Sequence, residues 1–319
     1  MKKRFQYFFL FIFCVLGILL CAVEEYPPGY TYSDDPYVLV LGIGQDGGVP
    51  QAGTDHPGWE NPKRAEKVVS LGVVDPKTNE RWMIEATPDF RRQLHMLNEE
   101  VEEKSAVPDG IFLTHAHIGH YTGLMFLGHE SMGADKARVY AMPKMAEFLS
   151  QNGPWNQLVK YENIALTKLA TDSTIVLNER ISITPFLVPH RQEYSEVVGY
   201  RIEGPDKSIL FIPDIDSWEE WDEWGVSIEE QIKNVDIALL DATFFANGEI
   251  PGRDMSNFPH PFISHSMDRF SGLSAVHKAK VHFIHFNHTN PALVPGSEAQ
   301  KEIVERGYQL AKEGQRIPL

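Results

Sequence analysis

Short apolar runs alternate with polar, turn-forming segments along most of the chain. The runs are rich in β-branched and aromatic residues, which is typical of buried strands. The runs that predict strands are 37–48, which ends in glycines, 67–75, 82–86, 137–142, 164–176, 180–189, 208–214, 234–245 and 280–291. Helical spacing is found at 88–97, 145–151 and 297–314. Strands and helices therefore alternate in both halves, which predicts an α/β fold.

The N-terminal residues follow a different pattern. Lys2, Lys3 and Arg4 precede an apolar run that extends to about residue 22, which is typical of an export signal peptide or a membrane anchor. A lipoprotein is less favoured, because Leu20 stands before Cys21 where a small residue is expected. We interpret 1–22 as this signal or anchor, 23–36 as a Pro-rich acidic tether, and 37–319 as one domain. The protein is expected to be exported, and to be periplasmic or membrane-anchored through its N-terminal segment alone.

Composition limits the partners of this domain. Apolar residues make up 43% of the chain, which is enough for a large core. Both cysteines, Cys14 and Cys21, lie in the N-terminal run, so neither disulfides nor thiolate ligands are expected in the domain. The formal net charge is −15, without a dense stripe of Lys and Arg. A nucleic-acid partner is therefore not expected.

Three histidines follow one apolar run at close spacing. His115 and His117 point to the same side of an extended chain, so both can reach one metal ion. His120 begins a predicted short helix and would approach the same pocket from another direction. The spacing predicts a metal site with room for a second ion about 3.5 to 4 Å from the first.

Further candidates stand at the ends of other apolar runs. His190 ends one predicted strand, and Asp214 ends another, where a buried carboxylate needs a partner such as a metal ion. His285 lies near the end of the last predicted strand. His265 follows a long loop, 248–263, of the kind that often carries binding residues.

Around these residues the chain resembles the metallo-β-lactamase superfamily. His-Ala-His-Ile-Gly-His at 115–120 is similar to the superfamily motif HxHxDH, with Gly119 in place of the aspartate. A resemblance to the branch of pyrroloquinoline quinone (PQQ) biosynthesis protein B is found at LGIGQDGGVPQ, IEATPDFRRQL and FIHFNHTNP. The stretch PHRQEYSEVVGYRI is similar to the superfamily's next metal histidine and the strand after it. The matches occur in order over residues 37–319. They imply a four-layer αβ/βα sandwich with a metal cleft at one edge of its two sheets.

The resemblance also implies a role for each candidate. The implied metal ligands are His115, His117, His120, His190, Asp214 and His285. Asp214 would lie between two ions, and His265 would donate a proton to the leaving group, so these two are the candidate catalytic residues. The expected function is that of a metallo-hydrolase in which metal-bound water attacks an ester, amide, lactone or phosphoester of a small-molecule substrate.

The expected number of metal ions depends on Gly119. The first position has three imidazoles and a share of Asp214, whereas the second has lost one carboxylate. We therefore predict one tightly bound Zn²⁺ and a second ion that is weakly bound or absent. Iron or manganese would also suit ligands of this kind.

Two other functions remain open at this point. The nearest resemblance is to a branch associated with oxidative maturation of a quinone cofactor, which suggests an iron-dependent oxidative enzyme. The loss of the aspartate at Gly119 suggests instead a metal-binding module without catalysis. Metal content, oxygen uptake and hydrolytic turnover distinguish the three.

Overall fold

Most of the predicted runs become strands of two seven-stranded sheets. The computed structural model describes residues 34–102, 105–191 and 193–319, and Asp35–Leu319 form one unit. The predicted signal or anchor at 1–22 and all but the end of the predicted tether at 23–36 lie outside the described residues. Among the described residues, no helix is both long and apolar enough to span a membrane.

The first sheet is built mainly from the N-terminal half of the chain. Its order is β14-β1-β2-β3-β4-β5-β6. β2 and β3 form the predicted hairpin, and β3 to β6 run parallel. The strands are β1 (Tyr37–Gly42), β2 (Ser70–Asp75), β3 (Glu80–Ile84), β4 (Gly110–Phe112), β5 (Ala137–Ala141), β6 (Ile164–Lys168) and β14 (Arg316–Pro318).

The second sheet has the order β13-β12-β11-β10-β9-β8-β7. β10, β11, β12 and β13 are parallel, and the other pairs are antiparallel. The strands are β7 (Ile175–Val176), β8 (Ser182–Leu187), β9 (Val198–Glu203), β10 (Ser208–Ile212), β11 (Ile237–Asp241), β12 (Val281–Ile284) and β13 (Gln309–Leu310). The predicted strand 164–176 is wrong in one respect, because β6 and β7 belong to different sheets. Asp172, at φ 59°, turns the chain between them.

Alternating side chains on the strands separate two apolar cores. Val38 and Val40 of β1 belong to a core shared with the second sheet, whereas Leu39 and Leu41 belong to a core shared with helices. Strands of the second sheet are buried on both faces, as in β10, where all of Ile209–Ile212 is buried. Two sheets thus face each other with helices outside, which confirms the predicted four-layer α/β sandwich.

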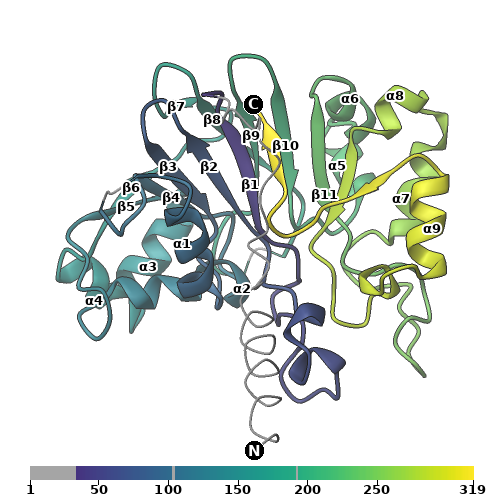
Figure 1. Cartoon of the computed structure of the whole chain (residues 1–319), viewed down its shortest axis with the longest axis horizontal. Helices are drawn as coiled ribbons and strands as arrows, with labels where there is room; N and C mark the ends of the chain where they lie inside the picture. The colour runs from purple at the N-terminus through teal and green to yellow at the C-terminus, as the bar shows by residue number, and fades with distance from the viewer. Residues whose placement is uncertain (1–33, 103–104, 192) are drawn as a thin grey trace, which may run out of the picture. The chain divides into compact units, whose positions relative to one another are not determined.

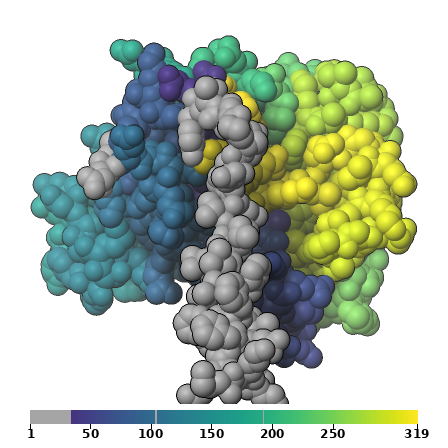
Figure 2. All heavy atoms as spheres, viewed as in Figure 1, coloured from purple at the N-terminus to yellow at the C-terminus, as the bar shows by residue number. Residues whose placement is uncertain are grey.

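The helices cover the outer faces of both sheets. In Figure 1, α1, α3 and α4 lie at the left and α7 and α9 at the right, with β1, β2, β9, β10 and β11 between the two groups. Figure 2 shows a similar division at the surface, with teal atoms on one side and light green and yellow atoms on the other. The helices are α1 (Phe90–Asn98), α2 (Ile118–Tyr121), α3 (Pro143–Gln151), α4 (Trp155–Lys160), α5 (Trp218–Glu223), α6 (Ile228–Lys233), α7 (Ile263–Arg269), α8 (Ala275–Lys278) and α9 (Glu298–Glu305).

The closing helix is shorter than the sequence predicts. Helical spacing predicts a helix at 297–314, but α9 ends at Glu305 and the chain continues into β13 and β14. Gly307 has φ 92°, a left-handed conformation that glycine adopts readily just beyond a helix end. The remaining residues complete the edge of each sheet instead.

His282 in β12 predicts a pH dependence of folding. Its Nδ1 is buried without a hydrogen-bond partner, and burial lowers the pKa of His282 to about 4. An unfolded chain protonates this residue near pH 6.5, so the folded state loses stability as the pH falls below that value. The unfolding free energy should therefore fall between pH 7.5 and pH 5 in both proteins, but by about 1 to 2 kcal/mol less in His282→Gln than in the wild type.

Urea denaturation of both proteins at the two pH values measures this difference. His129→Gln, at an exposed histidine, is the control and should leave the pH dependence of the wild type unchanged. An identical pH dependence in wild type and His282→Gln would contradict the prediction.

Candidate metal centre

Strand ends bring the first group of histidines together. His115 follows β4 and His190 follows β8, each three residues after the strand ends. Nε2 of His115 lies 2.8 Å from Nδ1 of His117, and Nε2 of His190 lies 3.3 Å from the same Nδ1. His115 and His190 are buried, and His117 is partly buried. Three imidazole nitrogens thus converge on one point, which suits a metal ion.

A second group lies beside the first and combines imidazoles with carboxylates. It consists of Asp46, His120, Asp214 and His285. Asp46 Oδ1 is 3.0 Å from Nε2 of His120 and 3.3 Å from Nε2 of His285. Asp214 Oδ2 is 3.3 Å and 3.4 Å from the same two nitrogens. Two imidazoles and two carboxylates therefore face one another across a space that suits a cation.

Asp214 faces both groups. Its Oδ1 lies 3.6 Å from Nε2 of His190 in the first group, and its Oδ2 faces His120 and His285 in the second. Oδ2 is fully buried without a hydrogen bond, which is costly for a carboxylate unless a cation is present. This oxygen and the converging donors fit a metal ion at each position, with Asp214 between them.

Each clustered imidazole is oriented by a partner on its other nitrogen. Glu85 Oε1 lies 3.1 Å from Nδ1 of His120, and Asp216 Oδ1 lies 2.7 Å from Nδ1 of His190. Hydroxyl groups do the same for His115 and His285: the partners are Thr114 Oγ1 at 2.8 Å and Thr243 Oγ1 at 2.9 Å. Such outer partners fix the ring orientation and raise the basicity of metal-binding histidines.

The two groups differ in their electrostatics. Burial and the neighbouring imidazoles hold the pKa of His115 well below its usual range, so this ring is neutral and can bind a metal. Burial alone would lower the pKa of His285, but Asp214, Asp241 and Asp46 raise it to about 10. The second position therefore attracts positive charge, either as protons or as a metal ion that displaces them.

Three residues of this site have strained backbone conformations. Glu85, His260 and His285 have φ angles of 75°, 88° and 70°, which side chains other than glycine rarely adopt. Such conformations cost about 1 to 3 kcal/mol each and persist where surrounding contacts hold them. The contacts here are the hydrogen bonds of these side chains within the cluster.

The structure brings together all six residues that the sequence proposed as metal ligands. It does not bring His265 to them. His265 lies on α7 with its side chain 48% exposed, and its Nε2 lies 3.3 Å from Glu219. The prediction that His265 lies at the metal site is therefore corrected: His260, from the preceding loop, lies there instead. His260 is grouped with His190 and Asp214.

Sequence reasoning missed three residues of the site. Asp241 ends β11 as a carboxylate after an apolar run, the same signal that identified Asp214, so it was detectable. Its Oδ2 lies 2.7 Å from Nδ1 of His260. His260 lies in a loop without a local pattern that marks it. Asp46 lies in the matched stretch LGIGQDGGVPQ, but its carboxylate was not predicted to be a ligand. Glu85, which lies in the matched stretch IEATPDFRRQL, contacts Thr114 and His120.

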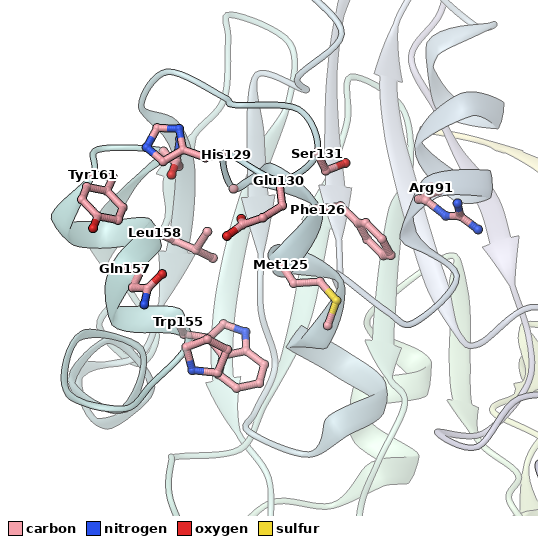
Figure 3. A pocket seen from close by; sticks show the side chains of 13 residues that line it. Arg91, Met125, Phe126, His129, Glu130, Ser131, Trp155, Gln157, Leu158 and Tyr161 are labelled. Carbon is pink, nitrogen blue, oxygen red and sulfur yellow. The ribbon is translucent and has the colours of Figure 1, made fainter.

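A cavity of about 460 Å³ lies elsewhere, between the segment after α2 and α4. Figure 3 shows Met125, His129, Trp155 and Tyr161 among its lining side chains. It shares no lining residue with the cluster. The chemistry is therefore assigned to the histidine and carboxylate groups.

Comparison with known families agrees with this geometry. The family model described as a beta-lactamase superfamily domain matches residues 80–286. The chain belongs to the metallo-β-lactamase superfamily. Its curated relatives are PQQ synthesis B proteins, at 22 to 23% identity. Coenzyme PQQ synthesis protein B of Methylobacterium sp. strain 4-46 is 23% identical, over 88% of this chain and 99% of the relative.

Solved structures show the same superfamily fold. Zn²⁺-bound PqqB from Methylobacterium extorquens has a TM-score of 0.72 at 21% identity, covering 89% of this chain and 100% of that one. A diphosphatase from the PhnP family has a TM-score of 0.61 at 22% identity, covering 89% and 98%. At this level of identity the likeness concerns the fold, and the chemistry must be argued from the site itself.

Proposed function

We propose that this protein is a metal-dependent hydrolase that acts on an ester, amide, lactone or phosphoester. The observation that carries the proposal is the pair of ligand groups joined by Asp214. Three imidazoles converge in one group, and two imidazoles with two carboxylates form the other. Zn²⁺ bound at such a centre would lower the pKa of a water ligand to about 7 and supply a nucleophile.

The side chains around the groups have distinct roles in this proposal. Asp216 and Glu85 orient the imidazoles of His190 and His120 through Nδ1, which leaves Nε2 of each ring available as a ligand. Because these partners are fixed before substrate binds, little reorganisation is needed during the reaction. The solved Zn²⁺-bound PqqB makes zinc the first metal to test.

His260 is the proton donor in this proposal. Its ring lies 5.3 Å from the ring of His190 and 5.8 Å from the ring of His285. Nδ1 is held by Asp241 at 2.7 Å, so Nε2 is the nitrogen that can exchange a proton with substrate. A histidine held by a carboxylate in this way can protonate a leaving group.

Metal analysis and turnover test the hydrolase. Protein purified without chelator should contain at least one equivalent of zinc, iron or manganese, and should hydrolyse at least one of bis(p-nitrophenyl) phosphate, p-nitrophenyl acetate, a lactone or a chromogenic β-lactam. Chelation should abolish turnover, and added Zn²⁺ should restore it. Less than about half an equivalent of metal would contradict the proposal of a metal-dependent hydrolase.

A second candidate is an iron-dependent oxidative enzyme. It is favoured by the curated relatives, which are PQQ synthesis B proteins over almost their whole length. Imidazole and carboxylate ligands suit iron as well as zinc. Oxygen uptake by the iron-loaded protein with a tyrosine-containing peptide would support it. Absence of uptake, together with turnover by the zinc form, would leave hydrolysis as the function.

A further inference from the structure

Gly119 and Asp46 occupy one place in the site. A Cβ atom built on Gly119 would lie 2.5 Å from Cα, 2.7 Å from Cγ and 2.8 Å from Cβ of Asp46. Real Cβ atoms do not approach other atoms so closely, and part of the contact is with backbone, which cannot rotate away. Residue 119 is therefore glycine because Asp46 fills the space in which a side chain at 119 would lie.

The carboxylate of Asp46 points at the second ligand group. Its Oδ1 lies 3.0 Å from Nε2 of His120 and 3.3 Å from Nε2 of His285. Nδ1 of His120 is engaged by Glu85, and Nδ1 of His285 lies beside Thr243. The two Nε2 atoms and the oxygens of Asp46 and Asp214 are thus directed at one point between them.

Backbone hydrogen bonds hold the Asp46 loop between the two sheets. Gln45 N–H donates to the carbonyl of Phe286 at 2.8 Å, and Phe286 N–H donates to the carbonyl of Ile43 at 2.8 Å. Gly44 N–H donates to the carbonyl of Lys67, also at 2.8 Å. The loop after β1 is therefore fixed to the end of β12, immediately after His285. This placement does not depend on any interaction made by the Asp46 side chain.

We propose that Asp46 is a ligand of the second metal ion and supplies the carboxylate that position 119 lacks. The site then has two imidazoles and two carboxylates at its second position, and the charge of Asp46 offsets repulsion between two dications. The reason for expecting a weak or absent second ion is thereby removed. The inference rests on the metal centre of the proposed function but not on hydrolysis.

Zinc titration of the metal-free full-length protein tests this. The wild type should bind two equivalents. Asp46→Ala should keep one equivalent at wild-type affinity and weaken the other at least about 100-fold, which corresponds to about 2.7 kcal/mol. The matched control is Asp55→Ala, at an exposed aspartate a few residues further on, which should bind two equivalents like the wild type.

A second variant separates the ligand role from a folding defect. Gly119→Ala removes no ligand but pushes against Asp46, so it should weaken the same equivalent while the far-UV circular dichroism of the metal-free protein stays native. If Asp46→Ala does not fold, Asp46→Asn, which keeps the side-chain volume, is used in its place, with the same expected loss of affinity for the second equivalent.

Two equivalents retained at wild-type affinity in Asp46→Ala, or a single equivalent in the wild type, would overturn the assignment. Two equivalents in the wild type, one of them dependent on Asp46, without any turnover would support the assignment and count against the hydrolase.

Discussion

His117→Ala is expected to lower hydrolysis at least about 1,000-fold and to remove one metal equivalent. Nδ1 of His117 lies 2.8 Å from Nε2 of His115 and 3.3 Å from Nε2 of His190. Without it, the first position keeps two imidazoles and a share of Asp214, too few ligands to hold the ion tightly. Metal content after dialysis and initial rates at saturating substrate measure the two effects.

Two variants serve as controls for this prediction. His129→Ala, at an exposed histidine outside the cluster, should leave metal content and rate unchanged. His285→Ala should reduce binding at the second position and leave the equivalent bound by the first group largely intact. If His117→Ala keeps its full metal content and rate, the three converging imidazoles do not form the reactive centre.

His260→Ala is expected to lower kcat about 100- to 1,000-fold with metal content unchanged. The imidazole is held by Asp241 at 2.7 Å and faces the cluster from a loop. Because a proton donor matters most for a poor leaving group, the loss should be greater for an alkyl ester or alkyl phosphoester than for the corresponding p-nitrophenyl substrate. Steady-state kinetics with both kinds of substrate and metal analysis of the same samples test it.

His265→Ala is the matched comparison, since the sequence alone favours His265 as the donor. Its side chain is 48% exposed and lies beside Glu219, so its removal should change kcat by less than about twofold. A large loss in His265→Ala with normal activity in His260→Ala would restore the prediction from sequence. Loss of a metal equivalent in His260→Ala would show that this histidine is a ligand instead of a proton donor.

The sequence by itself determined the sandwich and much of the ligand set. Apolar runs of strand length identify the buried strands, because a sheet covered on both faces needs continuous apolar residues. The end of such a run is also a local signal for residues of the metal site. His115, His190 and Asp214 stand within three residues of a strand end, where a polar side chain can leave the core and meet others at the same edge. The histidine spacing at 115–120 adds a signal that needs no tertiary contact.

Only the tertiary structure decided how the second position is completed and which histidine faces the cluster from the long loop. Asp46 and Gly119 are 73 positions apart in sequence, and their contact arises from a loop held by hydrogen bonds to Phe286. In the sequence motif, Gly119 stands where a carboxylate ligand is expected. In the folded chain, the absence of a side chain at Gly119 leaves the space that Asp46 fills. His260 lies at the cluster and has a left-handed backbone conformation, with φ 88°. His265, five residues later, lies on α7 and contacts Glu219 instead. Loop paths depend on long-range packing, which local sequence patterns do not encode.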